Sequence, residues 1–281
     1  MKAETLKQLH KVEQEILDEI DRICEKNGLK YYLIGGTLLG AVRHQGFIPW
    51  DDDLDIVMPR EDFNRFKEVC IQDLDPKYYL HSTETDPNKY YFSFMKVRKH
   101  NSIFIESKLV GANVDDDKQG IWVDIAPMDD ASSLDSFWKR VRTTWIKKHL
   151  QHFISYRKTN RWPKPLLSKL MYALLSPLST YCLRKLQDRL MQWENGRDCD
   201  YFVNYASHYD SVKMTMLKTD YEPSCRLLFE GKYYSAPGNY QNVLLRSFGK
   251  NYMDIPPIEK RETHTPVRLS FDTNGPDAPL D

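Results

Sequence analysis

The acidic run Asp-Asp-Asp-Leu-Asp at residues 51–55 constrains this chain more than any other stretch of its sequence. Successive side chains of a strand alternate between its two faces. If the run is extended, Asp51, Asp53 and Asp55 share one face, while Leu54 and the apolar residues after the run enter a core. Carboxylates two residues apart on a strand stand about 6–7 Å apart, and their repulsion raises their pKa values unless a cation lies between them.

The acidic face therefore predicts a metal site, because carboxylate oxygens suit Mg²⁺, Mn²⁺ or Ca²⁺ better than zinc. The alternative is an acidic turn that caps the helix predicted to follow Pro59. Two features favour the metal site. The acidic residues lie within an apolar pattern of period two, which places charge at a strand end, where the sites of α/β sheets lie. The segment before them is also suited to binding phosphate.

That preceding segment spans residues 31–44. Tyr31–Ile34 are predicted to form a strand, Gly35-Gly36 a tight turn, and Thr37–His44 a short helix. Small residues at such a turn let backbone N–H groups and a helix N-terminus approach a phosphate closely. A phosphate site beside metal-binding carboxylates implies phosphoryl chemistry, although a Gly-Gly pair alone indicates only a turn.

These two halves together carry a resemblance. The string GGTLLGAVRHQGFIPWDDDLDIVM closely resembles the LicD family, and its Gly-Gly-Thr turn followed by an Asp-x-Asp strand resembles the nucleotidyltransferase fold. The similarity covers residues 31–66, extends to 91–128 and more weakly to 228–264, and is absent over about 131–200. The family includes bacterial enzymes that transfer phosphocholine from CDP-choline to glycans, and it is related to fukutin-type transferases that use CDP-ribitol.

The resemblance also implies a third carboxylate from a later strand, which ligates metal or accepts the proton of the acceptor. Asp124 is the best match, within the apolar segment Gly120–Pro127. An unpaired buried charge there is expensive, so Asp124 needs a partner. Asp53, Asp55 and Asp124 are thus the predicted catalytic residues and the ligands of Mg²⁺ or Mn²⁺.

Further residues are predicted to bind substrate. Arg43 is suited to bidentate phosphate binding, with a surface ion pair as the alternative. Trp50 is suited to stacking on a base or fencing the metal site, or else to packing in the core. Lys96 and Arg98 project from one strand face and neutralise phosphates if that face carries Asp53 and Asp55; solvated strand charges are the alternative. The full predicted set is Gly35, Gly36, Thr37, Arg43, Trp50, Lys96 and His264, the last from the carboxy-terminal pattern of the family.

Asp129 and Asp130, just beyond Asp124, are interpreted as a cap for the next helix. Other predicted helices are 4–26, with a cap at Asn27-Gly28, 61–70 and 240–248. Predicted strands are 78–81, 91–98, 102–106, 120–127, 227–230 and 232–236, and residues after Thr265 read as a loose tail.

Residues 136–187 are anomalous because they contain twelve Lys or Arg residues and no Asp or Glu, within a chain of zero formal net charge. Their Trp, Tyr and Leu residues predict a helical insertion that meets anionic lipid at the membrane interface. A subdomain that packs on the core with a solvated basic side is the alternative. A membrane-spanning helix is excluded by Lys169, Pro177 and the short apolar run. No nucleic-acid-binding module accompanies the charge, so no nucleic acid is expected as a partner.

The predicted architecture is therefore α/β (α+β): a mixed nucleotidyltransferase-like sheet flanked by helices, with a basic helical insertion. Residues 1–130 are assigned to the catalytic core, 131–200 to the insertion, 201–265 to the part that completes the catalytic domain and 266–281 to the tail. The start of the chain has no signal-peptide pattern, and its five cysteines are scattered without a CxxC pair. Both suit a cytoplasmic protein, peripheral at the inner face of the membrane if the insertion binds lipid.

The resemblance implies transfer of a phospho-alcohol group, with CDP-choline as the favoured donor, to a hydroxyl of a glycan acceptor that is lipid-linked if the membrane interpretation holds. Alternatives are transfer of ribitol or glycerol phosphate, and true nucleotidyl transfer that releases pyrophosphate. A non-catalytic protein that binds glycans or a membrane surface is expected to have lost its carboxylates, and this chain keeps Asp53, Asp55 and Asp124.

Overall fold

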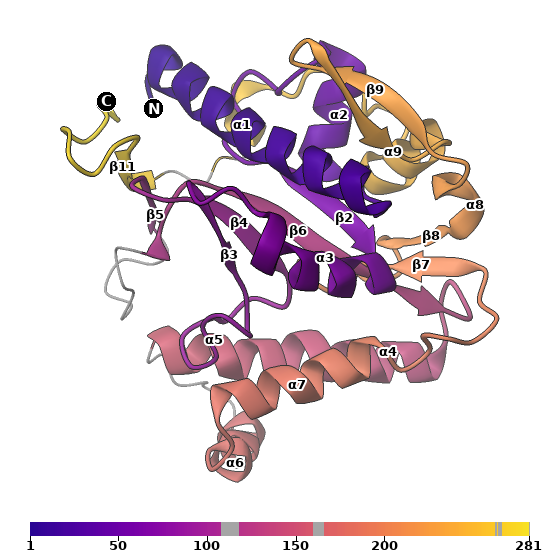
Figure 1. Cartoon of the computed structure of the whole chain (residues 1–281). Helices are drawn as coiled ribbons and strands as arrows, with labels where there is room; N and C mark the ends of the chain where they lie inside the picture. Colours follow the sequence, from indigo (N-terminus) through magenta and orange to yellow (C-terminus); the bar gives the residue numbers. More distant parts are fainter. Residues whose placement is uncertain (108–117, 160–165, 262, 264–265, 281) are drawn as a thin grey trace.

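A mixed sheet flanked by helices forms the centre of the protein, as predicted (Figure 1). The structure is a computed structural model that describes residues 1–281 except 108–117, 160–165, 262, 264–265 and 281. Helices α1 and α3 lie on one face of the sheet, and the helices of residues 137–191 form a separate layer below it (Figure 1). The helices are α1 (Ala3–Asn27), α2 (Gly35–His44), α3 (Arg60–Asp73), α4 (Phe137–Thr144), α5 (His152–Thr159), α6 (Leu166–Leu175), α7 (Thr180–Met191), α8 (Lys218–Tyr221) and α9 (Tyr240–Phe248).

The strands of the main sheet run in the order β1-β2-β6-β4-β3, and β7 and β8 extend it beside the end of β6. β2 and β6 are parallel, and the other pairs are antiparallel. These strands are β1 (Tyr32–Leu33), β2 (Asp55–Pro59), β3 (Tyr78–His81), β4 (Met95–Lys99), β6 (Trp122–Ala131), β7 (Tyr201–Val203) and β8 (Thr215–Leu217). Two separate antiparallel pairs join β5 (Ile103–Glu106) to β11 (Pro266–Ser270) and β9 (Cys225–Phe229) to β10 (Lys232–Ala236).

Helix α1 confirms the prediction from its apolar spacing. Leu9, Ile16, Ile20 and Ile23 are fully buried in the main core, because residues three and four apart share one helix face. The helix ends at Gly28, whose φ of 62° is left-handed and whose N–H donates to carbonyls of the last turn.

Asp129 and Asp130 do not cap a helix, so that prediction is wrong. Both belong to β6, and Ser136 caps α4 instead. Asp129 is fully buried and accepts two hydrogen bonds from Arg60, at 2.7 and 2.8 Å. Asp130 pairs with the half-exposed Lys218 at 2.8 Å. Their partners, Arg60 and Lys218, are distant in the sequence, so the local sequence does not reveal that these carboxylates belong to a strand.

The segment predicted as a helical insertion contains helices α4, α5, α6 and α7, with turns at residues 176–179 and 192–196. A π-helical stretch, Trp145–Gln151, joins α4 to α5, and α7 packs against it. These helices bury apolar clusters of their own around Ile146 and Leu150. The prediction of a basic surface is wrong for Lys139, Arg142 and Arg184, whose side chains turn inward. The division of the chain into domains stays a prediction.

The carboxy-terminal third completes the core. β9, β10 and α9 confirm the predicted hairpin and helix, and they pack on β1 and α2. The prediction that residues 266–281 form a loose tail is wrong. β11 pairs with β5, and the backbone N–H of Ala278 donates to Leu269 O at 2.7 Å. A short 3₁₀ turn, Ile258–Lys260, precedes β11.

Among the described residues, none of the helices is both long enough and apolar enough to span a membrane.

We expect Asp129→Ala to destabilise the protein by about 3–5 kcal/mol, because it leaves the buried guanidinium of Arg60 without its bidentate partner. Asp130→Ala breaks a half-exposed pair and should cost about 1 kcal/mol or less. Urea unfolding of both variants measures the difference. Equal losses in the free energy of unfolding would show that the buried Arg60–Asp129 pair stabilises the fold no more than the half-exposed pair does.

Candidate active site

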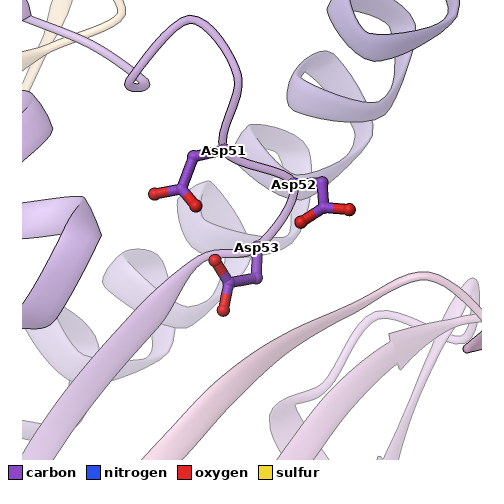
Figure 2. A group of neighbouring side chains, drawn as sticks. All are labelled: Asp51, Asp52 and Asp53. Atoms are coloured by element: carbon purple, nitrogen blue, oxygen red, sulfur yellow. The ribbon is translucent and has the colours of Figure 1, made fainter. Parts of the chain in front are cut away.

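The acidic run forms a loop, not the strand that was predicted. β2 begins only at Asp55, so the predicted face shared by Asp51, Asp53 and Asp55 does not form. The loop instead gathers Asp51, Asp52 and Asp53, whose ligand oxygens all lie within 4.8 Å of one another (Figure 2). Asp52 is 1% exposed and was not predicted as a site residue. Close carboxylate oxygens of this kind fit a hard divalent cation.

Helix α2 begins at the glycine pair, two residues earlier than predicted, and its first turn faces the acids. A Cβ atom on Gly36 would lie 2.5 Å from Asp51 Oδ2, and one on Gly35 would lie 3.7 Å from Asp55 Oδ2. Gly35 also has a φ of +59°, which favours glycine. The glycines therefore let two carboxylates approach the positive end of the α2 dipole, which stabilises negative charge.

Thr37 holds the start of β2 in place. Its Oγ1 accepts a hydrogen bond from the backbone N–H of Asp55 at 2.9 Å. The side chain of Thr37 therefore positions the strand in this structure, whereas the sequence predicted it to bind substrate.

Three charged residues lie in one row across the sheet. Asp55 of β2 is opposite Asp124 of β6, and Asp124 is opposite Lys96 of β4. Directly opposed residues share a face, and neighbouring strands are about 4.8 Å apart. The backbone N–H of Asp124 also donates to Leu54 O at 2.9 Å, so the acidic loop runs on beside β6. Asp55 and Asp124 therefore lie on paired strands beside the acidic loop, whereas the carboxylates whose oxygens lie within 4.8 Å of one another are those of Asp51, Asp52 and Asp53. The predicted ligand set of Asp53, Asp55 and Asp124 stays a prediction.

Lys96 is the partner that Asp124 needs. Its ammonium donates to Asp124 Oδ1, and the side chain is 2% exposed. Burial lowers the pKa of Lys96, and the charge of Asp124 opposes that shift. Rings of Trp122, Phe92 and Phe94 surround the ammonium at 4.2, 4.7 and 5.2 Å.

The alternative of solvated strand charges is wrong for this strand. Arg98 is also buried, and it donates to His81 Nδ1 at 3.0 Å and to Gly120 O at 2.6 Å. Lys96 and Arg98 therefore belong to a buried polar network beside the acidic loop.

Helix α1 supplies two groups that the sequence analysis missed. His10 Nε2 lies 2.7 Å from Asp51 O, and its ring stacks on Phe47. Glu13 is 2% exposed, and its Oε2 has no hydrogen-bond partner among the described residues. Burial, followed by the charges of Asp53 and the neighbouring acids, raises the pKa of Glu13 well above its usual range. The sequence contained an indication of this buried acid, because Glu13 lies on the apolar face of α1.

Arg43 lies in the last turn of α2, and Trp50 directly precedes the acidic loop. Arg43 donates to Tyr252 O at 3.1 Å and to Asp254 O at 2.9 Å, so it is not the surface ion pair considered as its alternative. Trp50 is half-buried, and the guanidinium of Arg261 lies 3.9 Å from its ring centroid. His264 lies outside the described residues.

A mixed sheet that carries clustered carboxylates beside a glycine-paired helix N-terminus defines a nucleotidyltransferase-type domain. The family model described as "LicD/FKTN/FKRP, nucleotidyltransferase domain" matches residues 28–170. The chain therefore belongs to the LicD family, as the resemblance predicted, and it is a transferase.

Two kinds of named relative match the chain. It is 29% identical over 271 residues to the lipopolysaccharide cholinephosphotransferase LicD of Haemophilus influenzae, which covers 94% of this chain and 97% of that protein. It is also similar to the ribitol 5-phosphate transferase FKRP of human and mouse, at 43% identity over 47 residues. That second match covers 17% of this chain and 10% of FKRP.

We expect Gly36→Ala to reduce turnover by about 100-fold, because the new Cβ displaces the Asp51 carboxylate and misplacement by about 1 Å costs that much. Gly275→Ala is the control, since its Cβ meets only Asp272 O at 3.4 Å. Steady-state turnover and circular dichroism of both variants give the comparison. Normal turnover by Gly36→Ala would mean that the Asp51 carboxylate need not lie against α2.

Proposed function

We propose that this enzyme transfers a phospho-alcohol group from a CDP-alcohol to a sugar hydroxyl of a cell-surface glycan precursor and releases CMP. Phosphocholine from CDP-choline is the favoured group. The observation that carries the proposal is the row of Asp55, Asp124 and Lys96 beside the acidic loop. The similarity to a lipopolysaccharide cholinephosphotransferase along 94% of the chain supports the choice of choline.

In the proposed reaction, the oxygen of the sugar hydroxyl forms a bond to the β-phosphorus of the donor. The bond between that phosphorus and the bridging oxygen breaks, and CMP leaves with the bond electrons. Asp124 takes the hydroxyl proton as general base. Lys96 orients Asp124 through their ion pair. The glycine-paired N-terminus of α2 orients the diphosphate through its backbone N–H groups.

Asp53 and Asp55 are proposed to hold Mg²⁺ or Mn²⁺, and Asp124 would be a further ligand if it does not act as the base. Asp51 and Asp52 lie close enough to Asp53 to contribute oxygens. The donor set fits such an ion because every ligand is a carboxylate oxygen. When bound, the ion supplies positive charge that stabilises the diphosphate and the leaving CMP.

The donor test uses the purified protein, Mg²⁺, a glycan acceptor and a panel of CDP-choline, CDP-ribitol and CDP-glycerol. We expect CMP release that is fastest with CDP-choline and that is abolished by EDTA and restored by added Mg²⁺. Ribitol transfer is a second candidate, favoured by the 47-residue similarity to FKRP. Fastest CMP release with CDP-ribitol would select it, and pyrophosphate release from CTP would replace both by nucleotidyl transfer.

We also propose that the helical insertion docks the enzyme on an anionic membrane at its cytoplasmic face, where a lipid-linked acceptor lies. Leu170 and Leu174, one turn apart on α6, are 62% and 79% exposed. Leu178 and Tyr181 follow them with exposed side chains. Helix α6 also projects away from the sheet (Figure 1). Exposed apolar groups flanked by basic residues such as Lys169 suit an anionic interface.

Co-sedimentation with vesicles tests this docking. We expect pelleting with anionic but not neutral vesicles, weakened by molar salt because screening shortens to about 3 Å. The double substitution Leu170→Ser with Leu174→Ser should abolish pelleting, and the exposed Ile71→Ser on α3 is a matched control. Equal pelleting of the two variants would remove α6 from the interface.

A further inference from the structure

A pocket lies between α7 and the segment that leads into β4, away from the acidic loop. It is a small pocket that opens to solvent. Its lining includes Lys67, Ser82, Ser93, Phe94, Arg184 and Lys185. The lining also includes Met95, and the ring centroid of Phe94 lies 5.2 Å from Lys96 Nζ.

Arg184 is the least satisfied cation of this pocket. The residue is 3% exposed, and its Nη1 donates to Gln151 Oε1 at 2.9 Å and to Gln187 Oε1. Its Nε and Nη2 are buried and have no acceptor among the described residues. Burial lowers the pKa of Arg184 to about 9. Guanidinium is nevertheless a strong cation whose planar fork matches an oxyanion with two parallel hydrogen bonds.

Tyr90, which is not among the residues that line the pocket, is a second buried residue with an unpartnered donor. It is 2% exposed, and within the described part of the chain its hydroxyl has no hydrogen-bond partner. Burial raises the pKa of Tyr90, and so does the charge of Asp124, while the charges of Arg98 and Arg184 lower it. The tyrosine therefore stays protonated as a donor, and it lies within electrostatic reach of both Asp124 and Arg184.

The acids that line the pocket are already engaged. Glu84 lies 3.5 Å from Lys67 Nζ and 3.1 Å from Lys185 Nζ, and Asp188 pairs with Arg60 at 2.8 Å. Neither carboxylate has an ion pair with Arg184 in the described structure. A buried donor without an acceptor destabilises the fold, and more so when it is charged, so an acceptor from outside the chain would stabilise this site.

We propose that Arg184 and Tyr90 form a binding site for an oxyanion, a phosphate or carboxylate group, that enters through this pocket. Arg184 Nε and Nη2 donate to two of its oxygens, and the Tyr90 hydroxyl donates to one of them. The assignment of this group to the glycan acceptor rests on the proposed transferase function, since Phe94 both lines the pocket and contacts the ammonium of Lys96. The oxyanion site itself does not depend on that function.

Thermal unfolding of the full chain in potassium phosphate, against potassium chloride of equal ionic strength, tests the site. We expect the wild-type Tm to rise with phosphate and to saturate. Arg184→Met should weaken phosphate binding by about tenfold or more, because hydrogen bonds to charged groups contribute about 1.5–3 kcal/mol. Tyr90→Phe should weaken it by about fivefold, in line with one neutral hydrogen bond. The control Lys232→Gln removes an exposed charge that pairs with Asp18 outside the pocket lining, and it should keep phosphate binding within about twofold.

Arg184→Met should fold with a Tm in chloride at or above that of the wild type, because it removes a buried charge without a counter-ion. Tyr90→Phe gives an independent result if Arg184→Met fails to fold. The proposal is overturned if the wild type shows no rise specific to phosphate, or if the substitutions leave that rise unchanged. A second arm compares N-acetylglucosamine 6-phosphate with inorganic phosphate. Tighter binding of the sugar phosphate places the oxyanion on the acceptor, and equal binding assigns the site to free phosphate.

Because these measurements need no turnover, a failure of the transferase proposal leaves their result intact.

Discussion

The parallel pairing of β2 with β6 places Asp55 directly opposite Asp124, and this register is the constraint on which the rest of the site depends. Two carboxylates on neighbouring strands repel each other in a partly dry environment. The chain offsets that repulsion with the ammonium of Lys96 on the next strand and with the N-terminus of α2 near Asp55. The remaining negative charge is what a divalent cation would neutralise, so the register, the glycines and the lysine form one electrostatic unit.

Local periodicity was enough to predict the elements whose burial follows a simple repeat. Helix α1 follows its three- and four-residue spacing, and β3, β10 and α9 begin and end where the sequence predicted. The glycine pair was predicted to form a turn that approaches phosphate, and the structure places it against the acidic run, where a Cβ on Gly36 would lie 2.5 Å from Asp51 Oδ2. In each case the physical cause acts within a few residues, so the sequence carries it directly.

The failures have a common cause in long-range pairing. Asp129 looked like a helix cap because its partner, Arg60, is 69 residues away. The tail looked loose because β5, which β11 needs as a neighbour, precedes it by about 160 residues. The acidic run was assigned to a strand because of its apolar alternation. Its first three aspartates instead form a loop in which Asp52 is buried. Glu13 could have been found as an acid on an apolar helix face, but the sequence alone does not show what it faces.

Asp124→Asn tests the catalytic row most directly. It removes the negative charge that lies between Asp55 and Lys96 and preserves the size and shape of the side chain. Asp130→Asn, six residues further along the same strand, is the matched control. The measurement is CMP release from CDP-choline in the presence of acceptor and Mg²⁺, with urea unfolding as a check on the fold. The account predicts a loss of several orders of magnitude in turnover for Asp124→Asn and near-normal turnover for Asp130→Asn. Similar turnover by the two variants would contradict a catalytic role for Asp124 and for the row that contains it.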